Sequence, residues 1–158
     1  NNSIKFVSEI LKQFEKFDAV LLIENLFPDI NRNHSLCCSL SQIEDFFSKV
    51  SDNVMLLLDL GHWNITSNIM GFDKFKYLEK LINKFENKIL EIHLSENDGM
   101  QDQHLAIRKE SWQISFIREF QQNAKKHNID KIYCIESRNA TKKDLKNSIY
   151  YVNEALNI

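Results

Sequence analysis

Long hydrophobic segments are missing from this 158-residue sequence, and no apolar run approaches the roughly 20 residues of a membrane span. Glycine occurs three times and proline once, so we find no flexible linker and expect a single domain over residues 1–158. Positive charge is not in excess: the formal net charge of −2 provides no electrostatic basis for wrapping nucleic acid. We therefore expect neither a membrane nor a nucleic acid as a partner.

The sequence also lacks a disulfide framework. It has three cysteines, of which Cys37 and Cys38 are adjacent and so do not have the CxxC spacing of a redox or zinc motif. We therefore expect the reducing cytoplasm as the location of the protein. The start of the chain is neither a signal peptide nor an initiator methionine, and we expect the chain to be trimmed or part of a longer one.

Four short apolar runs predict buried strands, at residues 19–23, 54–58, 88–92 and 132–135. Three of these runs are nearly continuous, which is typical of strands covered on both faces. Between the runs, apolar residues recur at three- and four-residue spacing, which predicts helices within residues 4–17, 40–50, 72–85, 114–124 and 145–156. Strands that alternate with helices indicate an α/β fold with a parallel sheet.

Two architectures fit this alternation, a doubly wound sheet and half of a (β/α)8 barrel. A barrel usually has about 250 residues, so four strands are half of its complement. Four strands alone would leave two long apolar edges, which proteins in solution normally cover. We expect either a missing N-terminal half or a second copy, in a homodimer, to cover them.

The residue that follows each apolar run is of a metal-ligand type: Glu24, Asp59, His93 and Glu136. In a parallel α/β sheet these positions lie at the same edge, where active sites are found. Carboxylates together with imidazole suit a divalent ion such as Mn²⁺, Mg²⁺, Co²⁺, Fe²⁺ or Zn²⁺. One polar residue at a strand end is common, but four of four are hard to obtain by accident.

Three further residues extend this candidate metal site. His62 follows Asp59 by three positions, and we expect Gly61 to permit a tight turn that points both side chains into one pocket. Asp102 and His104 are two residues apart in a loop, so they share a face if the loop is extended. The two other histidines, His34 and His127, are interpreted as surface residues.

The ordered set of these motifs resembles the xylose isomerase-like barrels, a superfamily that includes sugar phosphate isomerases/epimerases and endonuclease IV-type apurinic-site nucleases. The motifs are Glu24-Asn25, Asp59-Leu60-Gly61-His62, His93-Leu94-Ser95-Glu96-Asn97-Asp98-Gly99, Asp102-Gln103-His104 and Glu136. The resemblance implies the C-terminal half of a TIM (β/α)8 barrel, strands five to eight. One departure lies after His104, where the family commonly has a glycine-rich stretch and this chain has Leu105-Ala106-Ile107-Arg108-Lys109-Glu110.

The resemblance also implies roles. Glu24, Asp59, His93 and Glu136 match the family's metal ligands, and the two glutamates match the pair that moves protons in its epimerases. His62 matches a substrate-binding histidine. In endonuclease IV relatives, the positions of His62, Asp102 and His104 join a multi-zinc cluster.

Two residues next to these motifs are further substrate-binding candidates. Trp63 either forms an apolar wall for a sugar or packs in the core. Arg138 either reaches a substrate phosphate or carboxylate or lies on the surface.

We therefore expect a divalent-metal-dependent isomerase or epimerase of a sugar or sugar phosphate, with Glu24 and Glu136 as base and acid. Asp59 and His93 are then pure ligands, and His62, Asp102 and His104 contact the substrate. Two alternatives stay open: an endonuclease IV-like zinc phosphodiesterase acting on abasic DNA, and a degenerate barrel without activity.

Overall fold

The computed structural model describes residues 2–14, 17, 19–29, 35–126, 130–138 and 140–157. His34 and His127 lie outside the described residues. No helix within these ranges is long and apolar enough to cross a membrane.

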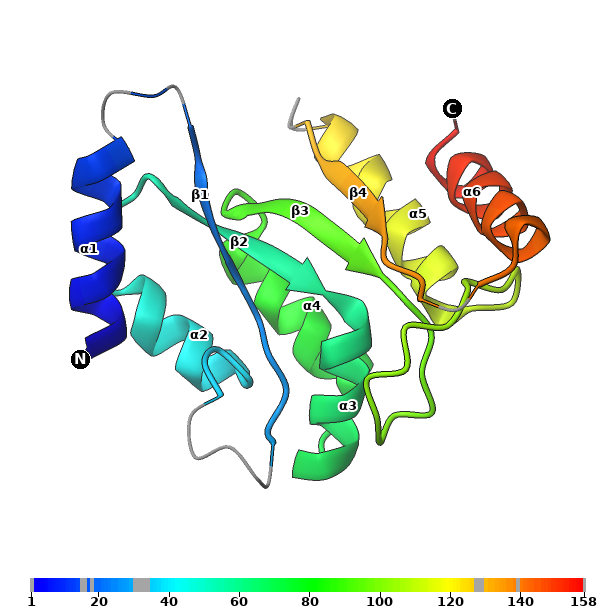
Figure 1. Cartoon of the computed structure of the whole chain (residues 1–158), viewed down its shortest axis with the longest axis horizontal. Coiled ribbons are helices and arrows are strands. Elements are labelled where there is room, and N and C mark those ends of the chain that lie inside the picture. The colour runs from blue at the N-terminus through cyan, green and yellow to red at the C-terminus, as the bar shows by residue number, and fades with distance from the viewer. Residues whose placement is uncertain are drawn as a thin grey trace.

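The centre of the fold is a parallel sheet of four strands in the order β1-β2-β3-β4 (Figure 1). The strands are β1 Leu21–Glu24, β2 Val54–Asp59, β3 Ile89–Leu94 and β4 Ile132–Ile135. Because all three strand pairs are parallel, the carboxyl ends of the four strands lie at the same edge of the sheet. This arrangement confirms the expected α/β fold, in which four parallel strands follow one another as in part of a (β/α)8 barrel.

The helices are α1 Asn2–Phe14, α2 Leu40–Phe47, α3 Leu60–Met70, α4 Lys74–Phe85, α5 Trp112–Lys126 and α6 Lys142–Leu156. The sequence predicted one helix between the second and third strands, but the structure has two, α3 and α4. Helix α3 escaped prediction because it is buried on most of its circumference, so its apolar residues show no stripe. Gly71 ends it in the left-handed conformation, with φ 68°, and Asp73 caps α4.

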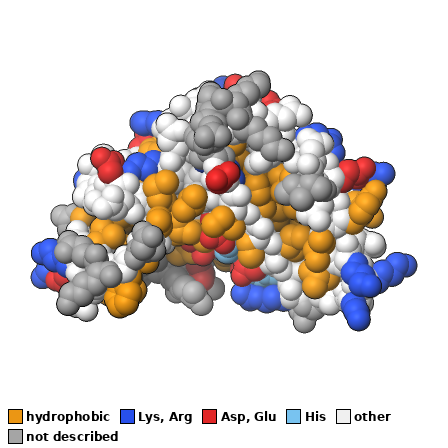
Figure 2. All heavy atoms as spheres, turned by 90° about the horizontal axis from the view of Figure 1, so that it is seen from above, with side chains coloured by type: hydrophobic (Ala, Val, Ile, Leu, Met, Phe, Trp, Pro, Cys, Tyr) orange, Lys and Arg blue, Asp and Glu red, His pale blue; other side chains and the backbone are white. Residues whose placement is uncertain are grey.

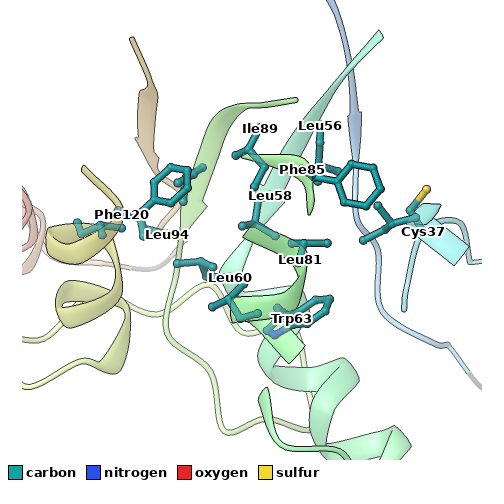
Figure 3. Close-up of a cluster of buried hydrophobic side chains, with 14 of the residues drawn as sticks. Cys37, Leu56, Leu58, Leu60, Trp63, Leu81, Phe85, Ile89, Leu94 and Phe120 are labelled. Atoms are coloured by element: carbon teal, nitrogen blue, oxygen red, sulfur yellow. The ribbon is translucent and has the colours of Figure 1, made fainter. Parts of the chain in front are cut away.

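One face of the sheet packs against the helices and forms the core. Alternate residues of β2 are fully buried there, namely Val54, Leu56 and Leu58. They join buried side chains of β3, α3 and α4, as well as Phe120 of α5 (Figure 3). This face therefore anchors the strands whose ends carry the candidate ligands.

The opposite face, which we call the inner face, is only half buried. It carries the strand residues that alternate with the core, including Met55 and Leu57 of β2 and His93 of β3. The molecule is hollowed on one side, where hydrophobic side chains gather around acidic and histidine side chains (Figure 2). The expectation of strands covered on both faces is therefore wrong for this chain by itself, because four strands curve through only part of a barrel.

Candidate functional site

The sheet brings the four predicted ligands to one rim. Glu24 ends β1, Asp59 ends β2, and Glu136 directly follows β4. His93 lies inside β3, which continues to Leu94, rather than after it. The pairing of Asp59 with His93 in the β2–β3 register sets these two residues side by side.

Three of these side chains form a compact group. Ligand atoms of Asp59, His93 and Glu136 lie within 4.8 Å of one another. His93 Nδ1 is 3.9 Å from Asp59 Oδ2 and 3.4 Å from Glu136 Oε2. These distances leave room for an ion among the three groups without direct hydrogen bonds between them.

Two atoms of this group are buried without a hydrogen-bond partner, Asp59 Oδ2 and His93 Nδ1. An unpaired buried polar atom costs free energy that a bound cation would offset. Burial raises the pKa of Asp59, and the nearby His62 only partly opposes this effect. A divalent cation beside Oδ2 would stabilise the charged carboxylate instead. The donor set therefore fits a divalent metal.

Glu24, the fourth predicted ligand, belongs to a second group with Asp59 and His62. His62 Nδ1 donates to the backbone oxygen of Asn25 at 2.9 Å and lies 3.1 Å from Glu24 Oε1. The four expected ligands are thus distributed over two overlapping groups, which share Asp59.

Charge is concentrated around His62. Burial disfavours its protonated form, but the hydrogen bond to Glu24 and the negative charge of Asp59 outweigh burial and raise the pKa of His62 from 6.5 to about 9. The same hydrogen bond lowers the pKa of Glu24. In the absence of a metal, His62 and Glu24 therefore form an ion pair at neutral pH.

The loop after β3 returns Asp102 and His104 to this rim. Its ends are joined by an antiparallel bridge in which Glu96 and Leu105 exchange backbone hydrogen bonds at 2.9 and 2.8 Å. Asp102 Oδ2 is 2.8 Å from His104 Nε2 and 3.6 Å from His62 Nε2. His104 Nδ1 donates to the backbone oxygen of Glu136 at 3.2 Å.

Helix α3 holds this loop in place. Asn97 Nδ2 donates to the Gly61 oxygen at 2.9 Å, and Asn64 Nδ2 donates to Asn97 Oδ1 at 2.8 Å. Gly61 is helical rather than part of the expected tight turn, and what it supplies is space. A Cβ atom there would lie 2.5 Å from Ser95 Oγ and 3.1 Å from Asp59 Oδ1. The close approach of loop and helix therefore depends on Gly61.

Two predicted substrate contacts lie elsewhere. Trp63 is fully buried in the core, where its Nε1 donates to the Lys74 oxygen at 3.1 Å and its ring packs on Phe72. It is therefore a packing residue and does not line the hollow. Arg138 is exposed, and its backbone N–H donates to the His104 oxygen at 2.8 Å. Its contact with the site residues thus runs through the backbone.

Two residues with contacts at the rim were not predicted. Asn25 is fully buried, and its side chain accepts from the Asp59 N–H at 2.7 Å and donates to the Asp59 oxygen at 3.1 Å. Glu91 Oε1 lies 3.0 Å from His93 Nε2. The sequence carried a signal for both: an asparagine directly after a strand-end acid, and an acid inside an apolar run.

A groove among the described residues lies away from this rim. It has a volume of about 760 Å³ and runs between α4 and α5 on the helix side, lined by residues such as Phe75, Trp112 and Phe116. It contains none of the candidate ligands. The chemistry of the inner face, rather than the size of the groove, identifies the candidate site.

A profile of the family described as "Xylose isomerase-like TIM barrel" matches residues 1–155. The chain belongs to this family. No curated protein matches it significantly. This xylose isomerase-like chain resembles the crystal structure named "Putative Xylose isomerase" from Rhodospirillum rubrum, with a TM-score of 0.61 and 16% identity, a likeness that shows the fold alone. The match covers 94% of this chain and 50% of that one, so this chain spans half the length of that structure.

We predict that Gly61→Ala destabilises the xylose isomerase-like chain by about 1–3 kcal/mol, because the added methyl group overpacks against Ser95 Oγ. Urea unfolding measures this change. Adding Ser95→Ala to Gly61→Ala should recover part of the loss, since it removes the atom nearest to the new methyl group. Equal losses in the single and double variants would contradict this account.

We also predict a pH effect for the metal-free chain. The pKa of His62 is raised to about 9 in the folded chain. Protonated His62 therefore stabilises the folded chain fully below pH 6.5, and this contribution is lost as the pH rises through about 9. The free energy of unfolding should decrease by about 3 kcal/mol over this window. His62→Gln should lack this decrease, and chemical denaturation of both proteins at several pH values measures the difference. Parallel curves for the two proteins would refute the assignment.

Proposed function

We propose that this chain provides the metal-binding half of an isomerase or epimerase that acts on a sugar or sugar phosphate. One observation carries the proposal: Asp59 Oδ2 and His93 Nδ1 are buried, have no hydrogen-bond partner and face each other at 3.9 Å beside Glu136. Family membership supports the same class of reaction.

Asp59, His93 and Glu136 would hold the ion, with Glu24 joining from the overlapping group. Mixed oxygen and nitrogen ligands accept Mn²⁺, Mg²⁺, Co²⁺, Fe²⁺ or Zn²⁺. A divalent cation bound there would polarise a carbonyl or hydroxyl oxygen of the substrate and stabilise the negative charge left when the neighbouring carbon loses its proton.

Proton transfer is assigned to Glu24 and Glu136. Their side chains are 32% and 35% exposed, so a substrate in the hollow can reach both. They follow β1 and β4, the two outer strands of the described sheet, and therefore approach such a substrate from two sides. One carboxylate removes the proton and the other returns it.

Three other polar residues would orient the substrate. His62 Nε2 lies 3.6 Å from Asp102 Oδ2 at the rim, so this imidazole is in a position to hydrogen-bond a substrate oxygen. Asp102 lies between the two imidazoles, with its Oδ2 2.8 Å from His104 Nε2 and 3.6 Å from His62 Nε2. Together these groups would fix the hydroxyl groups of a sugar-like molecule against the proton-transferring carboxylates.

We further propose that four more strands complete the site, either from an N-terminal half or from a second copy of this chain. The half-buried inner face supports this, because its apolar side chains are left open by the four strands described. Sedimentation of the isolated chain separates the two sources. A homodimer would indicate a second copy, whereas a monomer that binds a separately produced N-terminal half would indicate the first source. A chain that stays monomeric and does not bind the N-terminal half would contradict this proposal.

The metal site is tested by elemental analysis after gentle purification. We predict one divalent ion per chain in the wild type and in Glu119→Gln, an exposed control on α5. The ion should be lost in a variant that combines His93→Ala and Glu136→Gln, because both ligands leave the group around Asp59. Retention of the ion in this double variant would contradict the assignment.

Catalysis is tested by incorporation of solvent deuterium into ketoses and aldoses, which reports proton removal from carbon. Glu136→Gln should reduce exchange by roughly 10²–10⁴-fold while the circular dichroism spectrum stays unchanged. Undiminished exchange would contradict the role of Glu136. Wild-type protein with neither metal nor exchange would favour a degenerate barrel without activity.

A second candidate is phosphodiester cleavage at abasic DNA. One observation favours it: His62, Asp102 and His104 form a chain of close contacts, at 3.6 and 2.8 Å, next to the first metal group. The net charge of −2 does not favour binding of a polyanion. Nicking of an abasic duplex without deuterium exchange into sugars would select this reaction.

A further inference from the structure

Glu91 is an acidic residue in the middle of β3, whose other residues apart from His93 are apolar. It precedes His93 by two positions in β3, so both side chains point to the inner face. Its register partners are Leu57 on one side and Ile132 on the other, which offer the carboxylate no polar contact. Its side chain is 20% exposed. A half-buried carboxylate between apolar neighbours needs a polar partner, and His93 is that partner.

The contact between Glu91 and His93 determines where the imidazole carries its proton. Glu91 Oε1 lies 3.0 Å from His93 Nε2. An ionised carboxylate only accepts hydrogen bonds, so the proton of the neutral imidazole resides on Nε2. The lone pair is then on Nδ1, the nitrogen that is buried without a hydrogen-bond partner.

This lone pair faces two further acceptors, Asp59 Oδ2 at 3.9 Å and Glu136 Oε2 at 3.4 Å. Three acceptor atoms turned toward one another repel unless a cation lies among them. Without Glu91, the proton would be expected on Nδ1, where both carboxylates can accept it. The hydrogen bond from Nε2 therefore keeps Nδ1 available as a ligand.

We propose that Glu91 is a positioning residue that holds His93 in the Nε2–H tautomer and aims Nδ1 at the cation. A carboxylate on the far nitrogen of a metal-binding imidazole fixes both the tautomer and the ring orientation. The inference rests on the proposed function for the identity of the metal site, but the tautomer is a property of the metal-free chain and can be measured separately.

Cys134 marks the main competing arrangement. It pairs with His93 in the β3–β4 register, and its Sγ lies within 4.8 Å of ligand atoms of Glu91 and His93. These three residues would bind an ion directly only if Nε2 gave up its proton and the Glu91 hydrogen bond. Asp59 Oδ2 and His93 Nδ1 would then stay unpaired. The observed hydrogen bond favours positioning over direct ligation.

The tautomer is tested by long-range ¹H–¹⁵N correlation spectra of the metal-free, ¹⁵N-labelled chain, at a pH above the ordinary imidazole range. The His93 signals are assigned by their loss in His93→Gln. We expect the Nε2–H tautomer in the wild type and in Glu119→Gln, and a shift to the Nδ1–H tautomer in Glu91→Leu. An Nδ1–H tautomer in the wild type, or an unchanged tautomer in Glu91→Leu, would overturn the proposal.

Metal affinity provides the second readout, by calorimetric titration of Co²⁺ or Zn²⁺. Glu91→Leu should weaken binding by roughly 10–100-fold, as is usual when the partner of a metal-binding histidine is lost. Glu91→Gln keeps an oxygen acceptor and should give an intermediate affinity, which also carries the test if Glu91→Leu does not fold. Cys134→Ala should bind as the wild type does. Equal losses in Cys134→Ala and Glu91→Gln would show direct ligation and overturn the positioning role.

The two proposals fail in different ways. A wild type that binds no metal but shows the Nε2–H tautomer, lost in Glu91→Leu, would refute the metal site and leave the Glu91 contact established. A wild type that binds metal with unchanged affinity in Glu91→Leu would support the metal site and refute the role of Glu91.

Discussion

The buried carboxylate of Asp59 is the constraint on which the rest of the rim depends. Its Oδ1 accepts from the His62 N–H at 2.6 Å and so starts α3, while its Oδ2 faces His93. Asn25 holds its backbone on both sides. A fully buried carboxylate is costly unless each oxygen has a partner. One oxygen accepts from the N-terminus of α3, and the other is buried with no hydrogen-bond partner among the described residues.

The helix that Asp59 starts also organises the loop that completes the rim. Helix α3 holds this loop through Asn64 and Asn97, and the absence of a side chain at Gly61 allows the close approach. Asp102 and His104 then reach the rim from the far end of the loop. The candidate ligands around Asp59, the contacts of Asp102 with His62 and His104, and the loop after β3 are therefore parts of one connected structure rather than separate motifs.

The open inner face explains why the site looks incomplete as a pocket. The strand residues that form the core are buried, while those that alternate with them are half exposed. The candidate ligands stand at the carboxyl end of this exposed face, where a barrel enzyme would bind its substrate. The four strands set the geometry of the candidate ligands, and the half-buried inner face leaves these ligands open on one side.

Much of the fold and of the candidate site was predictable from the apolar runs and from the residues that follow them. The four strands, their parallel order and the positions of Glu24, Asp59 and Glu136 at the rim follow from short apolar runs ending in polar residues. Helix α3 could not be seen, because burial around its circumference removes the periodic signal, and Trp63 was therefore open to two interpretations. The role of Gly61 was misread as a turn because its close neighbour, Ser95, comes from a distant part of the chain.

The sequence by itself determined the α/β fold class and the residue types at the rim. Local apolar patterns specify the strands, and the residues that follow them specify the available ligand chemistry. Only the tertiary structure decided how these candidate ligands are distributed between the two overlapping groups that share Asp59. Register and strand alternation set Asp59 and His93 face to face, direct Glu24 toward His62, and bring Glu91 under the imidazole of His93. The first two relations depend on distances between residues of different elements. The third depends on side-chain orientations within β3, which the alternation of the strand alone does not specify.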